Sequence, residues 1–212
     1  MSIRILIADD HGIVRQGLRM YLQLDPELEV VGEASNGKEA VELAGKLRPD
    51  LVLMDILMPE MDGLEATAAI RKALPDTEVI ALTSVLDEAT IHQTIHAGAI
   101  GYILKDTGSE GLCQAIHAAV AGQVQLSRQA ALRLAAEQDE PQLREKLTER
   151  ETDVLQQIVR GCSNKEIGLN LGIAEKTVKA HVGSILSKLG AASRTQAALI
   201  AIRSGLAKLE DL

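Results

Sequence analysis

The sequence predicts an α/β domain with a parallel sheet, followed by a small all-α domain. Short, continuously apolar runs alternate with segments of helical spacing through the first part of the chain, a pattern typical of a parallel sheet covered on both faces. Beyond residue 125 no such apolar run occurs, and only helical patterns follow. Five βα units in about 122 residues match a doubly wound, flavodoxin-like (βα)5 architecture.

The expected elements follow from these patterns one by one. Strands are predicted at the runs IRILIA, VVGEA, LVLMD, VIALTS and GYILK, and helices are predicted to begin near Gly12, Gly37, Gly63 and Glu88 and after Ser109. In the second half, two capping boxes open short helices at Thr148–Glu151 and Ser163–Glu166. Gly172 ends the second of these, and further helices are expected from about Glu175 to Leu189 and from about Arg194 to Ser204.

A change in charge and composition separates the two halves. Pro141, within a charged stretch, marks a linker, so we expect domains at 1–125 and 143–212 joined by residues 126–142. The first 125 residues carry 9 Lys/Arg against 19 Asp/Glu, a net charge of −10, whereas the remainder carries 13 against 11, a net charge of +2. Two domains with different partners are indicated.

The overall composition excludes several classes of protein. With 46% hydrophobic and 25% charged residues, the chain is expected to be globular, and it has no apolar run long enough to insert in a membrane. The N-terminus lacks the features of a signal peptide, and two cysteines far apart in sequence favour a reduced, cytoplasmic setting. Without Phe or Trp, aromatic stacking on single-stranded nucleic acid is excluded.

Polar residues gather where the predicted strands end. Asp9 and Asp10 follow the first strand, Asp55 ends the third, and Thr83 and Lys105 close the fourth and fifth. Carboxyl ends of parallel strands share one edge, so three carboxylates, a hydroxyl and an ammonium should meet there, which suits Mg²⁺ and a phosphoryl group. Each residue alone could equally be a turn or helix N-cap residue, which is how His11 and Asp106 are interpreted.

Four segments of the first half resemble a response-regulator receiver domain: IADDH, LVLMDILMPEMDG, ALTS and GYILKD. The resemblance implies that Asp55 is the phosphoacceptor. It implies a Mg²⁺ site formed by Asp9, Asp10, Asp55 and the backbone carbonyl of Leu57. It further implies that Lys105 and Thr83 contact the phosphoryl group and that Tyr102 moves with Thr83 on activation, with the segment after the fourth strand as the switch.

Two apolar side chains lie close to the predicted phosphoacceptor in sequence. Leu57 and Val85 stand two residues after Asp55 and Thr83, and neither can orient an attacking water by hydrogen bonding. We therefore hypothesise a slow loss of the phosphoryl group; simple filling of space is an equally good interpretation of both residues.

The predicted helix at 175–189 has two distinct faces. An apolar stripe, including Val178, Ile185 and Leu189, faces a core, and the opposite face carries small polar residues and lysines that could enter a major groove. A plain helical bundle with a solvated face is the alternative. The segment from Leu147 to Ala198 resembles a LuxR-type (NarL/FixJ) DNA-binding domain with a helix-turn-helix. By that resemblance the residues that contact DNA are Lys179, Ala180, Gly183, Thr177, Ser184, Lys188 and Asn164.

Two positions depart from this second pattern. Ala174 stands where a Ser-type helix cap is usual, and such a cap contributes about 1 kcal/mol. Gly183 stands where a longer side chain is common, so either the backbone approaches DNA closely there or specificity depends on Lys179 and on DNA shape.

The sequence therefore predicts a phosphorylation-activated transcriptional regulator of a two-component system. Its expected partners are a sensor histidine kinase, double-stranded promoter DNA, a second copy of itself and RNA polymerase, and it is expected not to be a turnover enzyme. The sequence fits two other classes of protein less well. An aspartyl phosphatase usually has a D-x-D pattern on the first strand, which IADDHG lacks, and an interaction module that is never phosphorylated does not need the intact set of polar residues.

Overall fold

The computed structural model describes residues 2–84, 88–124 and 145–207 of the chain. The chain divides into two compact units, Met1–Val120 and Ala121–Leu212, and each is described by itself. Among the helices of these described residues, none is long and apolar enough to cross a membrane. The predicted linker 126–142 lies outside the described residues, and the predicted domain boundaries stay predictions.

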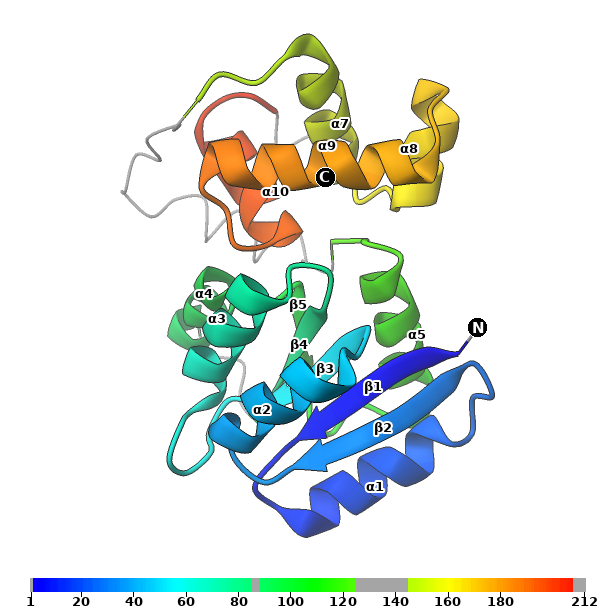
Figure 1. The fold of residues 1–212 in the computed structure, drawn as a ribbon, viewed down its shortest axis with the longest axis vertical. Coiled ribbons are helices and arrows are strands. Elements are labelled where there is room, and N and C mark those ends of the chain that lie inside the picture. Colours follow the sequence, from blue (N-terminus) through cyan, green and yellow to red (C-terminus); the bar gives the residue numbers. More distant parts are fainter. Residues whose placement is uncertain (1, 85–87, 125–144, 208–212) are drawn as a thin grey trace. The chain divides into compact units, whose positions relative to one another are not determined.

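The first unit is a five-stranded parallel sheet in the order β2-β1-β3-β4-β5 with helices on its faces (Figure 1). Its strands are β1 (Ile3–Ala8), β2 (Leu28–Ala34), β3 (Leu51–Asp55), β4 (Glu78–Thr83) and β5 (Gly101–Leu104). Its helices are α1 (Gly12–Leu22), α2 (Gly37–Leu47), α3 (Gly63–Ala73), α4 (Glu88–Ala97) and α5 (Ser109–Val120). The predicted flavodoxin-like (βα)5 architecture is confirmed.

Both faces of this sheet are buried, which explains why its strands are apolar without a break. Side chains alternate across a strand, so Ile5 and Ile7 of β1 join a core under α1 and α5, together with Leu112 and Ile116. The intervening residues of β1 and β3 pack on the opposite face against α2 and α3, in a core that includes Leu6, Ala8, Val52, Met54, Ala40, Ala44, Ala66 and Ile70. Parallel strands buried on both faces are the expected outcome of βα alternation.

The register of the strands sets which residues meet at the carboxyl edge. Ala8 of β1 pairs with Met54 of β3, so the next residues, Asp9 and Asp55, lie at the same level of the carboxyl edge. Thr83 pairs with Leu104, which places Lys105 directly after the last strand. The chain builds outward in opposite directions from β1 and β3, and this switch point is where open α/β sheets bind ligands.

The second unit is all-helical among its described residues. It contains α7 (Glu149–Val159), α8 (Asn164–Leu171), α9 (Glu175–Leu189) and α10 (Arg194–Arg203). Both predicted capping boxes are present, at Thr148–Glu151 and Ser163–Glu166. α8 ends at Gly172, whose φ of 65° suits glycine, and a short turn leads into α9. A helix-turn-helix is the result.

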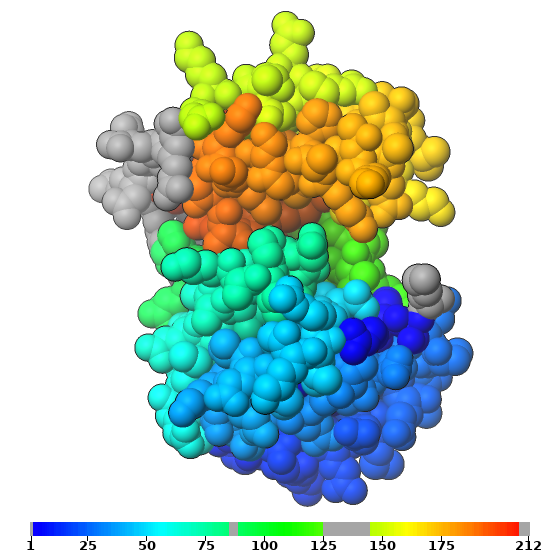
Figure 2. Space-filling model, in the orientation of Figure 1, coloured from blue at the N-terminus to red at the C-terminus, as the bar shows by residue number. Residues whose placement is uncertain are grey.

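The predicted apolar stripe of α9 faces the core of this unit. Val178, Ile185 and Leu189 are buried there, and Val182 and Leu186 pack against them. The core is completed by α7 and α10, which contribute residues such as Val154, Ile158, Ala197 and Ala201. The opposite face of α9 is therefore left at the surface, and Figure 2 shows this helix, in orange, running across the exterior of the unit.

Candidate functional site

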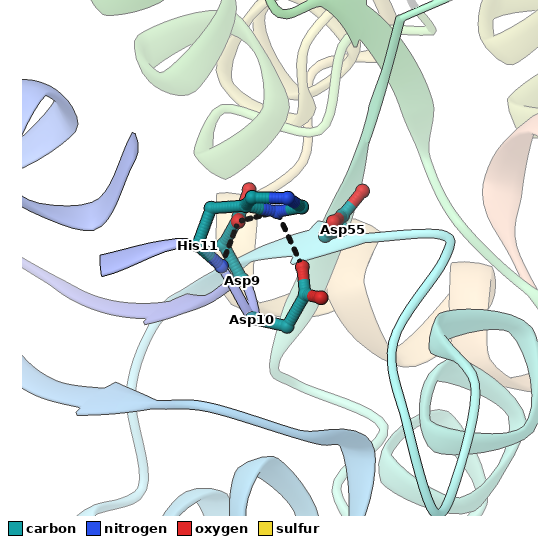
Figure 3. A group of neighbouring side chains, drawn as sticks. All are labelled: Asp9, Asp10, His11 and Asp55. Atoms are coloured by element: carbon teal, nitrogen blue, oxygen red, sulfur yellow. Dashed lines mark hydrogen bonds and ion pairs between the residues drawn. The ribbon is translucent and has the colours of Figure 1, made fainter. Parts of the chain in front are cut away.

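Three aspartates and a histidine from neighbouring strand ends lie together at the carboxyl edge of the sheet (Figure 3). Asp9 and Asp55 are almost fully buried, with 0% and 4% of their surface exposed, whereas Asp10 is exposed. The backbone N–H of His11 donates a hydrogen bond of 2.8 Å to Asp9 Oδ1, which fixes that carboxylate at the end of β1. The edge predicted from strand order is thus assembled with its three carboxylates.

A single lysine joins the two buried carboxylates. Lys105 Nζ lies 2.8 Å from Asp9 Oδ2 and 2.8 Å from Asp55 Oδ2. Burial disfavours a charged ammonium, but the hydrogen bonds to Asp55 and Asp9 outweigh it and raise the pKa of Lys105. The lysine therefore stays charged, and it must serve two negative groups at once.

The pKa of Asp55 is raised above its ordinary value. Burial is the main cause; the hydrogen bond from Lys105 acts in the opposite direction, and the negative charge of Asp9 raises the pKa further. Two buried carboxylates that share one lysine are incompletely neutralised. Additional positive charge at this edge would relieve the repulsion between them, and three sets of carboxylate oxygens are the donors that a hard divalent cation prefers. The donor set fits such an ion.

The helix that follows Asp55 in sequence fits closely against the end of β3. The backbone N–H of Gly63, the first residue of α3, donates to the carbonyl oxygen of Ile56 at 2.9 Å. A Cβ at this position would lie 1.9 Å from the Asp55 carbonyl oxygen, so no residue other than glycine fits without movement of the backbone. This close approach holds the Asp55 backbone in place.

The remaining predicted residues lie on or just after the strands that form this edge. Thr83 ends β4 and is buried, Tyr102 lies half-buried in β5, and the backbone N–H of Leu57 hydrogen-bonds to the Asp55 carboxylate. The side chain of Leu57 is 79% exposed. Residues 85–87, and with them Val85 and the predicted switch segment, lie outside the described residues.

His11 is a member of this group that the sequence did not single out. It occupies the N-cap position of α1, as the turn or N-cap interpretation expected, but its side chain makes no capping hydrogen bond. Instead, its ring nitrogen Nδ1 lies 2.6 Å from Asp10 Oδ1 and 3.5 Å from Asp9 Oδ1 (Figure 3). Asp106 lies in the turn after β5, as expected. Only the fold reveals that the imidazole is directed back toward the carboxylates.

In the second unit, the predicted DNA-contacting residues fall into two groups. Thr177, Lys179, Ala180 and Gly183 are exposed on the outer face of α9. Lys179 Nζ lies 3.5 Å from Glu175 Oε1, and both side chains are largely exposed. A Cβ on Gly183 would meet nothing within 4 Å, so no packing within the described residues requires glycine there. This face is free to approach another molecule.

Asn164, Ser184 and Lys188 have partners within the unit. Ser184 Oγ donates to Glu151 Oε1 at 2.6 Å, and Lys188 Nζ lies 2.7 Å from Glu151 Oε2. Asn164 Oδ1 accepts from Arg194 Nη1 at 2.7 Å, and the Asn164 backbone N–H donates to the carbonyl of Ala121 at 3.1 Å. Their predicted contacts with DNA stay predictions, and each has a structural role beside it.

The carboxylate of Glu151 has more partners than the capping box that the sequence predicts. Besides Ser184 and Lys188 it accepts a hydrogen bond from the backbone N–H of Thr148, as the capping box requires. Hydrogen bonds from Lys188, then Ser184 and the Thr148 backbone, outweigh burial and lower the pKa of Glu151 to about 2. The carboxylate therefore links the start of α7 to α9.

At the start of α9, Ala174 makes no side-chain capping bond, as predicted.

The chain combines a doubly wound α/β domain with a helix-turn-helix domain, and this combination defines its class of protein. The response regulator receiver domain family matches residues 5–117, and the luxR family of bacterial regulatory proteins matches residues 145–201. The chain belongs to the response regulators that carry a LuxR-type DNA-binding domain. This family was predicted from the motifs, and the matches confirm it.

Two known proteins and one solved structure are similar to this chain along nearly its whole length. The transcriptional regulatory protein LiaR of Bacillus subtilis (strain 168) is 45% identical over 210 residues, covering 96% of this chain and 99% of LiaR. The response regulator protein VraR of Staphylococcus aureus (strain Mu3) is 41% identical over 207 residues, covering 97% and 99%. The crystal structure of response regulator ChrA from a heme-sensing two-component system matches with a TM-score of 0.53 and 38% identity, covering 97% and 98%.

Proposed function

We propose that this response regulator is switched by phosphorylation of Asp55 and that the phosphorylated form binds promoter DNA as a homodimer. The observation that carries the proposal is the pair of buried carboxylates, Asp9 and Asp55, that share the single ammonium of Lys105 at the carboxyl edge of the sheet. The exposed outer face of α9, in a domain of a DNA-binding family, supplies the output.

The reaction at Asp55 is the transfer of a phosphoryl group from a phosphohistidine of a sensor kinase. A carboxylate oxygen of Asp55 forms a bond to phosphorus while the bond between phosphorus and the histidine nitrogen breaks, and the nitrogen keeps the electron pair. Lys105, 2.8 Å from Asp55, is placed to neutralise the phosphoryl oxygens. Asp55 is consumed as an acceptor in each transfer, so the protein is a substrate of the exchange rather than a turnover enzyme.

A divalent cation belongs to this chemistry. When bound through Asp9, Asp10, Asp55 and the backbone carbonyl of Leu57, Mg²⁺ supplies positive charge to the transferring phosphoryl oxygens. Asp9 is held for this task by the His11 backbone N–H, and Asp55 by the N–H of Leu57. The incomplete neutralisation of the two buried carboxylates supports this assignment.

Phosphorylation then acts through charge. A phosphoryl dianion replaces a carboxylate monoanion, and new hydrogen bonds from Thr83 and Lys105 to its oxygens shift the region that follows β4. Thr83 is the last residue of β4, and Tyr102 lies on the adjacent strand β5, where it pairs with Ala81, two residues before Thr83. We assign these two residues to the switch.

Dimer formation is supported by apolar side chains at the surface of the first unit. Ile13 and Met20 on α1, and Leu24 just after it, are exposed. Large apolar side chains that cluster at a surface favour association with a partner. Two copies of the DNA-binding domain would then occupy paired half-sites, from which the complex contacts RNA polymerase.

The experiment combines phosphorylation, sizing and DNA binding in the full-length chain. Wild type and Asp55→Asn are incubated with acetyl phosphate and Mg²⁺, sized by light scattering, and used to select sequences from random DNA. The proposal expects dimers and an enriched, two-fold symmetric sequence with phosphorylated wild type only. Equal dimer formation and equal DNA selection by both proteins would contradict it.

A further inference from the structure

The carboxyl edge of the sheet holds a nitrogen donor as well as oxygen donors. Asp9, Asp10, His11 and Asp55 each offer one ligand atom, and these atoms all lie within 4.8 Å of one another (Figure 3). Ligand atoms bonded to one cation at about 2.1 Å lie roughly 3 to 4 Å apart. The 3.5 Å between His11 Nδ1 and Asp9 Oδ1 matches that separation, and the 2.6 Å between Nδ1 and Asp10 Oδ1 needs only a small opening.

The imidazole of His11 is held near the carboxylates by its own backbone. The backbone N–H of His11 donates a hydrogen bond to Asp9 Oδ1, which keeps the residue at the end of β1. Its side chain is 65% exposed and makes no capping bond, so the ring can turn by the small amount that metal binding requires. The backbone of His11 is therefore fixed in position, whereas its imidazole ring can change orientation.

A histidine at this place changes which cation the edge prefers. Mg²⁺ is satisfied by carboxylate, carbonyl and water oxygens and gains little from imidazole nitrogen, whereas first-row transition ions such as Zn²⁺ bind imidazole strongly. Three carboxylates and one imidazole complete a four-ligand set for Zn²⁺, and a tetrahedral site with four protein ligands has no open position.

We infer that His11 makes this edge a mixed-donor site at which a transition-metal cation, with Zn²⁺ as the case to test, displaces Mg²⁺. The inference rests on the proposed function, because it concerns the same carboxylates. Zn²⁺ occupies the oxygens of Asp55 and leaves no open position, so the transition metal acts as an inhibitor of the switch. His11 is the residue that determines this selectivity.

The test measures metal binding directly in the full-length protein. Zn²⁺ is titrated calorimetrically into wild type and His11→Gln, with and without excess Mg²⁺, so that the Mg²⁺-competable Zn²⁺ site is isolated from any other. We expect His11→Gln to weaken that Zn²⁺ site about tenfold or more while the Mg²⁺ affinity changes much less. Because the side chain of His11 is exposed, its replacement should leave the fold intact, and far-UV circular dichroism checks this.

A matched control uses the second group of side chains in the described residues whose geometry would allow them to hold a metal ion. Asp25, Glu27 and His117 also lie within ligand distance of one another, and His117 Nε2 is 2.8 Å from Asp25 Oδ2. His117→Gln should leave the Mg²⁺-competable Zn²⁺ site unchanged. Equal Zn²⁺ affinity in wild type and His11→Gln overturns the inference, as does Zn²⁺ binding that Mg²⁺ does not displace.

The outcomes for the two proposals are separable. Formation of a phosphoryl adduct with Mg²⁺, but Zn²⁺ binding that is independent of His11, removes this inference and leaves the proposed function standing. Zn²⁺ binding that depends on His11 and competes with Mg²⁺, without any adduct on Asp55, supports the inference and removes the phosphorylation switch.

Discussion

Each unit of the protein holds a buried carboxylate against a lysine, yet the two carboxylates differ in their ionisation. At the edge of the sheet, burial raises the pKa of Asp55, and Asp9 competes for the same lysine. In the second unit, hydrogen bonds from Lys188, Ser184 and the Thr148 backbone lower the pKa of Glu151 to about 2. Burial dominates at Asp55, whereas hydrogen bonds outweigh burial at Glu151.

The comparison separates a reactive site from a structural one. Glu151 has more than one donor to itself and is electrostatically satisfied, so its role is to hold two helices together. Asp55 shares the ammonium of Lys105 with Asp9 and is left with uncompensated negative charge, which a divalent cation can offset. The predictions below test this contrast, from the largest expected effect to the smallest.

Removal of the shared lysine should have the largest effect. Lys105→Met leaves Asp9 and Asp55 buried without a counter-charge and takes away the cation that faces the phosphoryl oxygens. We expect the rate of adduct formation with acetyl phosphate to fall about 100-fold or more, measured by intact mass spectrometry over time. Lys38→Met, an exposed residue of α2, is the control. A variant at position 105 that reacts at the wild-type rate would show that the lysine is dispensable.

Removal of the satisfied carboxylate should affect stability and not chemistry. Glu151→Gln breaks the ion pair with Lys188, and we expect it to lower the free energy of unfolding of the second unit by about 2 kcal/mol. Hydrogen exchange of α9 amides in the full-length protein measures this, and the phosphorylation rate should not change. Glu149→Gln, in the same turn but exposed, should lower the free energy of unfolding much less. An equal loss of stability in both variants would argue against a stabilising role for the ion pair between Glu151 and Lys188.

The stabilisation from Glu151 should also depend on pH in a defined direction. Its pKa is lowered from 4.5 to about 2 in the folded state, so its contribution is fully present above pH 4.5 and is lost as pH falls toward 2. The difference in stability between wild type and Glu151→Gln should therefore shrink over this range, as measured by hydrogen exchange. A difference that stays constant down to about 2 would mean that the ionised carboxylate is not what stabilises the domain.

Two lysines of α9 should differ in their effect on DNA binding. Lys179 is exposed on the outer face, so Lys179→Ala should weaken binding about tenfold and reduce the salt dependence by about one unit. Lys188 is tied to Glu151 at 2.7 Å, so Lys188→Ala should change stability more than the salt dependence. Binding isotherms at several salt concentrations give both quantities, and the opposite pattern would assign the phosphate contact to Lys188.

The smallest expected effect concerns the lifetime of the phosphoryl group. Leu57 is exposed two residues after Asp55, and Leu57→Asn would provide an amide able to orient an attacking water. One such hydrogen bond of about 1 kcal/mol shortens the lifetime about fivefold, measured as loss of the adduct with time. Leu57→Met should change little. If the asparagine variant keeps the wild-type lifetime, Leu57 only fills space.

The features that could be predicted from the sequence are those that local patterns determine. The capping boxes at Thr148 and Ser163 are contained in four residues each, and the strand ends at Asp9, Asp55 and Lys105 follow from parallel topology alone. The carboxyl edge could be predicted because parallel strands must end at the same side of a sheet.

The side-chain contacts between helices could not be predicted in this way. Glu151 meets Ser184 and Lys188 across 33 and 37 residues, and only the packing of α9 on α7 brings them together. The direction of the His11 ring depends likewise on a side-chain rotation that no sequence period encodes. Asn164, the first residue of α8, is assigned a DNA contact by the family resemblance, and its bond to Arg194, 30 residues away, could not be predicted from a local pattern.

The most direct test of the account is to locate a phosphoryl group on the chain. Wild type and Asp55→Asn are incubated with acetyl phosphate and Mg²⁺, weighed intact, and digested to find the modified peptide. The account predicts one phosphoryl adduct on wild type, on the peptide that contains Asp55, and none on the variant. An adduct that persists in Asp55→Asn, or its absence from wild type with both acetyl phosphate and a phosphorylated sensor kinase as donor, would contradict it.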